Sequence, residues 1–185
     1  ISLIFPQNEQ EKISIDAAYE KMLTLTRLAF PTVSIEAFEV THSYCPGTYD
    51  LSINGKKFAG IAQRRIKNGI SVMMYVSVNG AQQTRGQAMK RFYQEALKED
   101  FGTDGYPAVV PESMATLADL LEIPLTIEDV KQQFQLALTQ LYGESRSVDA
   151  LCWKEAHVTS EQWTDQINRM EERNKLKELA DDYSL

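Results

Sequence analysis

The stretch from Ser43 to Arg65, SYCPGTYDLSINGKKFAGIAQRR, contains a cysteine and a lysine whose side chains could act together on an acyl group. Cys45 stands directly before a proline and a glycine, and Lys57 follows in the next hairpin. An ammonium group favours the thiolate form of a nearby thiol, stabilises a developing oxyanion and can give a proton to a departing amine. Acyl transfer through a thioester needs all three effects.

The distance between these two residues decides whether they can cooperate. A straight strand, at about 3.3 Å per residue, would hold Cys45 more than about 20 Å from Lys57. Pro46-Gly47 is the preferred centre of a type II turn, which would bring residues 45 and 48 within about 7 Å of each other. Thr48 would still lie about 13 Å from Lys57 along the strand. Contact between the side chains of Cys45 and Lys57 is therefore feasible, but the sequence does not require it. A lone cysteine in a turn is more often unreactive than catalytic.

The hairpin around Lys57 brings small and polar residues close to it. Asn54-Gly55 favours a two-residue type I′ turn, because both central positions need positive φ. In that register Ser52 faces Lys57 and Asp50 faces Ala59, which leaves open space for a ligand above the lysine. The core side carries Leu51, Ile53, Phe58 and Gly60. The alternative is a solvated strand face with a weak Lys57–Asp50 pair.

The remaining candidates for chemistry are weaker. His42 could serve Cys45 as a base, but a histidine in a turn-rich loop more often lies at the surface. Cys152, in the apolar context ALCW, is typical of a small core residue. Two histidines and two cysteines form no zinc-type cluster, and the phosphate-binding patterns GxGxxG and GxxxxGK[ST] are absent, so we expect no metal and no cofactor.

A group of basic residues occupies the second strand of the hairpin, with no acidic residue between positions 54 and 67. Its members are Lys56, Lys57, Arg64, Arg65 and Lys67. Alternation along a strand divides them between two faces, so ordinary strand-edge charge is the simpler interpretation. Docking of an acidic protein is the alternative.

The surrounding pattern indicates a mixed fold of the α/β (α+β) class. Strands are predicted at 1–5, 34–40, 49–53, 56–65 and 70–78, the last three forming an antiparallel meander. Helices are predicted from Ser14 to Pro31, over 84–98, 113–121 and 126–142, and near the C-terminus, where Trp163, Ile167 and Met170 share a face. The segment 98–107, with two glycines and a proline, is typical of a mobile loop.

Composition limits the class of protein. The chain has 185 residues, 43% of them hydrophobic, which predicts one domain with one core. A net charge of −7 argues against a nucleic-acid-binding surface, and no apolar run approaches the roughly 20 residues of a membrane span. Two cysteines form no disulfide framework, so we expect a cytoplasmic protein. The first residue is Ile1, within an apparent strand, and we expect the natural protein to begin earlier.

The string CPGTYDLSINGKKFAGIAQRR resembles the lipoate and octanoate protein ligase-transferase family, and within it the LipL type of octanoyltransferase. The similarity continues through NGISVMMYVSVNG and RGQAMKRFYQEAL to the C-terminal helices. It implies a biotin/lipoate protein ligase-like fold, with a largely antiparallel sheet packed by helices. Residues 1–185 would be the C-terminal portion of one catalytic domain, with the sheet and active site in 1–98 and a mainly helical part in 99–185.

The resemblance also implies roles for individual residues. Cys45 would be the acyl-accepting nucleophile, and Lys57 would polarise the acyl carbonyl. The acyl site would be lined in part by Asp50, Ala59, Gly60 and Ala62. The implied reaction moves octanoyl groups from the glycine-cleavage H protein to lipoyl domains of 2-oxoacid dehydrogenases. The family's upstream Arg-Arg-x-x-Gly-Gly segment, with its His-Asp, is absent, so part of the acyl pocket is expected to be missing.

Two other functions remain open. An ATP-dependent lipoate-protein ligase would use the lysine without the cysteine, although such ligases usually have Asn-Asp where this sequence has Tyr49-Asp50. A non-catalytic module could dock acidic lipoyl domains through Lys56, Arg64 and Lys67.

Overall fold

The computed structural model describes residues 1–7, 12–66, 68–103, 105–144, 148 and 150–174. The chain divides into two compact units, Ile1–Ser145 and Arg146–Leu185. The first unit contains the sheet and the candidate site. The predicted division into 1–98 and 99–185 follows another boundary and stays a prediction.

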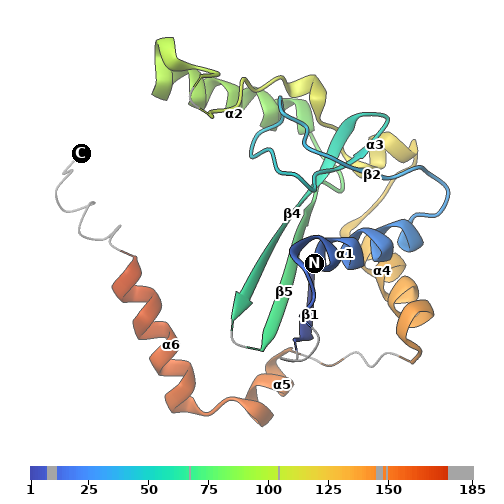
Figure 1. Cartoon of the computed structure of the whole chain (residues 1–185), viewed down its shortest axis with the longest axis vertical. Coiled ribbons are helices and arrows are strands. Elements are labelled where there is room, and N and C mark those ends of the chain that lie inside the picture. Colours follow the sequence, from blue (N-terminus) through green and yellow to red (C-terminus); the bar gives the residue numbers. More distant parts are fainter. Residues whose placement is uncertain (8–11, 67, 104, 145–147, 149, 175–185) are drawn as a thin grey trace. The chain divides into compact units, whose positions relative to one another are not determined.

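The described part of the first unit contains one antiparallel sheet of five strands (Figure 1). The strands are β1 (Ser2–Pro6), β2 (Glu36–Ala37), β3 (Leu51–Ile53), β4 (Lys56–Ile66) and β5 (Gly69–Val76), in the order β1-β5-β4-β3-β2. The predicted meander of the last three strands is confirmed. The strand predicted at 34–40 is reduced to the two residues of β2, which pair with β3.

The β3–β4 hairpin contains a β-bulge, which changes the site relative to the sequence prediction. Asn54 and Gly55 have φ of 52° and 74°, as a type I′ turn requires. Ser52 pairs with Lys57 as predicted, but Leu51 then pairs with Ala59, because a β-bulge interrupts the register. An extra residue reverses the faces of everything beyond it. The predicted placement of Ala59 beside Lys57 and of Gly60 on the core side is therefore wrong.

One face of the sheet is covered by α1 (Ile15–Ala29) and α4 (Ile127–Tyr142), which contact each other (Figure 1). Both helices begin at the predicted caps, Ser14 and Thr126, and α4 ends before Gly143, whose φ is 84°. The core between helices and sheet includes Met22, Leu25, Val130, Phe134, Leu51, Phe58 and Val72. Ala59 belongs to this core as well.

The cap of α4 is a reciprocal pair between Thr126 and Asp129. The carboxylate of Asp129 accepts hydrogen bonds from the Thr126 hydroxyl at 2.7 Å and from its backbone N–H at 2.8 Å. These bonds hold the pKa of Asp129 below its ordinary value. Their contribution to stability is therefore present above the ordinary pKa of a carboxyl group and is lost as the pH falls through the lowered pKa.

Helix α2 (Gln82–Leu97) follows the sheet and leads through η1 (Lys98–Asp100) to the segment before α3. The helix predicted over 113–121 is in fact two short pieces, η2 (Pro111–Ser113) and α3 (Leu117–Leu121). Between them the chain is extended and lies against β4, where the N–H of Ala115 donates to the carbonyl of Lys57 at 3.0 Å. This contact occupies the backbone of Lys57 and helps to fix its position.

The second unit contains α5 (Ala150–His157) and α6 (Ser160–Arg173). Cys152 is exposed, so its predicted place in a core is wrong. Trp163 and Met170 of α6 are also largely exposed, and the ammonium of Lys154 lies 3.9 Å from the Trp163 ring centre. None of the described helices in either unit has both the length and the apolar character needed to cross a membrane.

Candidate active site

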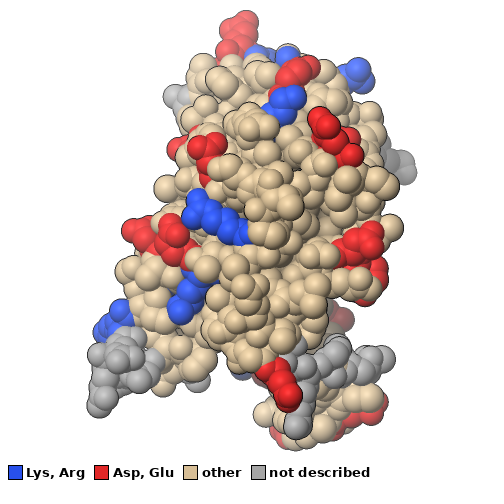
Figure 2. Space-filling model, turned by 90° about the vertical axis from the view of Figure 1, so that its right-hand side faces the viewer, with Lys and Arg blue, Asp and Glu red and all other residues tan. Residues whose placement is uncertain are grey.

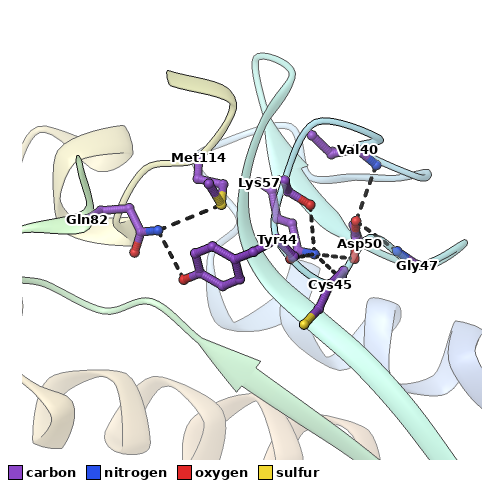
Figure 3. A network of polar contacts seen from close by, with 9 residues as sticks. Val40, Tyr44, Cys45, Gly47, Asp50, Lys57, Gln82 and Met114 are labelled. Carbon is purple, nitrogen blue, oxygen red and sulfur yellow. Dashed lines mark hydrogen bonds and ion pairs between the residues drawn. The ribbon is translucent and has the colours of Figure 1, made fainter. Parts of the chain in front are cut away.

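The centre of the site is the buried ammonium group of Lys57. Its Nζ lies 2.8 Å from Oδ1 of Asp50, and the two side chains are only 8% and 2% exposed. Nζ also donates to Oγ of Ser43 at 3.0 Å and to the carbonyls of Tyr44 at 3.3 Å and Cys45 at 2.8 Å (Figure 3). A buried charge is tolerated when it is paired and hydrogen-bonded in this way.

This arrangement differs from the open space predicted above Lys57. Residues 43–45 fold over the ammonium group and occupy that space, because three oxygens from consecutive residues accept hydrogen bonds from it. The plainer alternative, a solvated pair on a strand face, is also wrong, since both charged groups are buried.

Asp50 holds the loop as well as the lysine. Its Oδ2 accepts hydrogen bonds from the N–H groups of Val40 and Gly47, each at 3.2 Å. Its own N–H donates to the carbonyl of Gly47 at 3.0 Å. The carboxylate therefore connects Lys57 to both ends of the segment that carries Cys45.

Cys45 is brought to Lys57 by a turn other than the predicted one. The positive φ lies at Cys45, with φ of 51°, and not at Gly47, so Pro46-Gly47 is not the centre of a type II turn. The Asp50 N–H to Gly47 carbonyl bond instead closes a turn over residues 47–50. The 40–50 segment thus reverses direction and returns to β4, which a straight strand could not do.

The thiol of Cys45 is exposed and lies close to the ammonium group without pointing at it. Figure 3 shows the sulfur directed away from the Lys57–Asp50 pair, whereas the carbonyl of the same residue accepts from Nζ. Four covalent bonds separate that oxygen from Sγ, about 4.5 Å at full extension, so Sγ lies within about 7 Å of Nζ. A change of χ1 rotamer moves the sulfur over part of this distance.

A row of small residues runs along β4 on the same face as Lys57. A Cβ added to Gly60 would lie 3.6 Å from Cε of Lys57 and 3.8 Å from Oδ1 of Asp50. Alternation places the exposed Ala62 on this face too. The cross-strand partners of Gly60 and Ala62 are Tyr75 and Met73, both exposed. The result is an accessible apolar surface that leads to the ammonium group.

The other residues singled out from the sequence lie apart from this centre. His42 is exposed, as expected of a surface histidine. Arg65 donates to the carbonyls of Ile13 at 2.6 Å and Ser14 at 2.7 Å, so it anchors the start of α1. Lys56 and Arg64 are exposed, and Lys67 lies outside the described residues. On the face shown in Figure 2, basic and acidic residues are interspersed over largely uncharged surface.

Sequence reasoning missed three contributors to the site. Ser43 is fully buried and accepts from Lys57, although serine in a turn gives no distinctive signal. Tyr49 stacks on Tyr19 of α1, with ring centres 4.6 Å apart. Desolvation raises the pKa of Tyr49, and nearby acidic residues of α1, Asp16 first, raise it further, so its hydroxyl stays neutral. Gln82 contacts the ring hydroxyl of Tyr44 from α2.

The site contains no cluster of metal-binding side chains among the residues that the structure describes. Within the described ranges, no three His, Cys, Asp or Glu side chains lie close enough together to hold a metal ion. The one buried side-chain oxygen without a hydrogen-bond partner in that part of the chain is Oγ of Ser52, which faces Lys57 across the hairpin.

The small size of residue 60 gives a direct test of this geometry. We expect Gly60→Ala to be accommodated, because its Cβ meets only ordinary contact distances, and its melting temperature should stay close to that of the unsubstituted chain. Gly60→Val adds two further methyl groups beside the Lys57–Asp50 pair and should cost about 1–3 kcal/mol. Thermal unfolding of both variants measures the difference. Equal melting temperatures would show that residue 60 does not face the pair.

Comparison with known proteins shows the family to which the chain belongs. Residues 1–139 match the model of the lipoyl protein ligase A/B catalytic domain family. The chain belongs to this family.

Curated members of the family include close relatives of this chain. It is 44% identical over 176 residues to the octanoyl-[GcvH]:protein N-octanoyltransferase of Exiguobacterium sibiricum. This match covers 94% of this chain and 62% of the relative. It is 42% identical over 183 residues to the enzyme of the same name from Macrococcus caseolyticus. That match covers 96% of this chain and 63% of the relative. The chain therefore spans about three fifths of the length of these curated relatives.

Solved structures of ligases in this family share the fold. A lipoate-protein ligase A bound with ATP superposes with a TM-score of 0.55 at 11% identity, covering 80% of this chain and 55% of that one. A bi-partite lipoate protein ligase from Thermoplasma acidophilum gives a TM-score of 0.51 at 14% identity, with 80% and 52% covered. The lipoate protein ligase-like fold expected from the sequence is confirmed.

Proposed function

We propose that this protein transfers octanoyl groups from the glycine-cleavage H protein to lipoyl domains of 2-oxoacid dehydrogenases, in the cytoplasm, through a thioester on Cys45. The observation that carries the proposal is an exposed thiol on a residue whose carbonyl lies 2.8 Å from the buried Lys57 ammonium. The names of the curated relatives support the donor and the acyl group.

In the first step, Sγ of Cys45 attacks the carbonyl carbon of the octanoyl-lysine amide. The tetrahedral oxyanion is stabilised by Lys57, whose Nζ then exchanges one loop carbonyl for the substrate oxygen. The thiol has given its proton to solvent before the attack, the C–N bond breaks as Lys57 gives a proton to the departing amine, and the neutral lysine then regains a proton from solvent. The products are an octanoyl thioester and a free lysine on the donor.

In the second step, the amine of a lipoyl-domain lysine attacks the thioester. The same ammonium group stabilises the second oxyanion, the C–S bond breaks, and the proton released by the amine returns to the sulfur. An amide is broken and an amide is made, so the reaction needs no ATP and no cofactor.

The acyl chain fits the apolar surface beside the ammonium group. Gly60 and Ala62 leave room along β4, and Met73 and Tyr75 flank them on β5. Asp50 holds the Lys57 side chain in place through their ion pair. Ala59 packs into the core on the opposite face, so any effect of Ala59 on the acyl group acts through packing.

The test is intact-protein mass spectrometry after incubation with octanoylated H protein. We expect one octanoyl adduct, located by peptide mapping on Cys45 and cleaved by neutral hydroxylamine. Cys152→Ser is the matched control and should keep the adduct, because the second cysteine lies in the other unit. An adduct on Cys152, or transfer without any adduct, would contradict the thioester route.

The two alternatives give different results in the same assay. A ligase would transfer only with ATP and without a thioester, and it is favoured only by the fold shared with ligase structures. A carrier-binding module would bind lipoyl domains in a salt-sensitive way and would be indifferent to iodoacetamide, whereas a thiol-dependent transferase would be inactivated.

A further inference from the structure

The first residue of α2, Gln82, makes a hydrogen bond to the residue next to Cys45. Its side-chain amide is buried, with the residue 4% exposed. Nε2 donates to the hydroxyl of Tyr44 at 3.1 Å and to Sδ of Met114 at 3.9 Å (Figure 3). The proposed transfer chemistry uses none of these groups, so the buried contact calls for another explanation.

The orientation of the Gln82 side-chain amide is determined by the hydrogen bonds to its oxygen, Oε1. Oε1 accepts from the hydroxyl of Ser77 at 2.8 Å and from Nε and Nη2 of Arg85 at 3.1 and 2.8 Å. A flipped amide would place its NH₂ group against the two guanidinium donors of Arg85, which cannot accept, and would lose both of those bonds. The NH₂ group is therefore held toward Tyr44 by a network that is itself anchored to the end of β5 and the first turn of α2.

Tyr44 connects this network to the ammonium group. Its carbonyl accepts from Nζ of Lys57, and so do groups of the residues on either side, Oγ of Ser43 and the carbonyl of Cys45. The loop is thus attached at two points, by its backbone to Lys57 and by the Tyr44 ring to Gln82. Two attachments of the same three-residue segment restrict its rotation more than either does alone.

We propose that Gln82 is a positioning residue for the candidate nucleophile, acting through the Tyr44 hydroxyl. Without this bond the Tyr44 ring could rotate away, and residues 43–45 would be held at the Lys57 end only. The thiol would then spend less time at the distance from the ammonium group that acyl transfer needs. The catalytic part of this inference rests on the proposed function, whereas the positioning part concerns the loop itself.

The test combines two measurements on Tyr44→Phe and Gln82→Leu. Hydrogen–deuterium exchange reports the protection of the Val40, Ser43 and Gly47 amides, which are all hydrogen-bonded within the loop. Loss of the Gln82–Tyr44 bond should raise their exchange rates about fivefold. The rate of octanoyl adduct formation on Cys45 at saturating donor should fall about tenfold, with the half-saturating donor concentration unchanged.

Two matched variants control for general effects of the substitutions. Gln87→Leu makes the same change at an exposed position of α2, and Tyr142→Phe removes an exposed tyrosine hydroxyl from α4. Both should leave the exchange of residues 40–50 and the rate of adduct formation unchanged. Tyr44→Phe keeps the ring and its packing, so it remains informative if Gln82→Leu fails to fold.

Each outcome decides the inference. Unchanged exchange of residues 40–50 in Tyr44→Phe, or an equal rise across the whole chain, would overturn it. Faster local exchange together with a normal maximal rate of adduct formation would also overturn the catalytic part. Faster local exchange with no adduct in any variant, the unsubstituted chain included, would contradict the proposed function and leave the role of Gln82 in the loop established.

Discussion

Replacing Cys45 with serine lowers the rate of octanoyl transfer by about a thousandfold or more, because a serine hydroxyl without an adjacent base is a far weaker nucleophile than a thiolate. The melting temperature should not change, since the side chain of Cys45 is exposed and its contact with Lys57 uses the backbone carbonyl. Transfer between octanoylated H protein and a lipoyl domain, measured by mass spectrometry of both carriers, gives the rate.

The structure offers a sharp control for this experiment. Cys152→Ser makes the same chemical change at the other cysteine and should transfer at the normal rate. Iodoacetamide should abolish the transfer activity of Cys152→Ser. It should not change the residual activity of Cys45→Ser, which lacks the reactive thiol. A normal transfer rate in Cys45→Ser would exclude the thioester mechanism, whatever the fold of the chain.

Replacing Lys57 with methionine produces the second large effect, on stability as well as activity. Methionine fills much the same volume but leaves the carboxylate of Asp50 buried without its partner. Breaking a buried ion pair in this way costs about 3–5 kcal/mol. For a chain of this size the melting temperature should fall by roughly 6–20 °C. Differential scanning calorimetry measures the change.

A double variant separates the structural role of Lys57 from its chemical role. Lys57→Met combined with Asp50→Leu removes both charges, so part of the lost stability should return. The recovery is incomplete, because the N–H groups of Val40 and Gly47 lose the acceptor that Asp50 provides. Octanoyl transfer should stay at the level of Lys57→Met alone. Recovery of transfer in the double variant would show that Lys57 acts only by pairing with Asp50.

Several features of this protein follow from short stretches of its sequence. Asn54-Gly55 determines the hairpin turn, because its two residues readily adopt positive φ. Ser14 and Thr126 begin their helices, because each side chain can accept from an N–H three residues away. Cys45 and Lys57 could be singled out from their residue types and from the surrounding string. All of these rest on interactions within a few residues of the chain.

The arrangement of the site depends on interactions that no short stretch contains. The bulge between β3 and β4 reverses the faces of Ala59 and Gly60, and whether a strand gains an extra residue depends on packing across the whole sheet. The bond from Gln82 to Tyr44 joins residues 38 positions apart. Cys152 lies in an apolar string yet is exposed, because burial requires a partner surface as well as an apolar neighbourhood.

The sequence by itself thus determined which side chains could carry out the chemistry and the local turns and caps around them. Only the tertiary structure decided that residues 43–45 close over the Lys57 ammonium and present their oxygens to it. The physical reason is that a buried charge must collect its partners from wherever the fold brings them. Here these partners come from the loop before β3, and from Asp50 at its end.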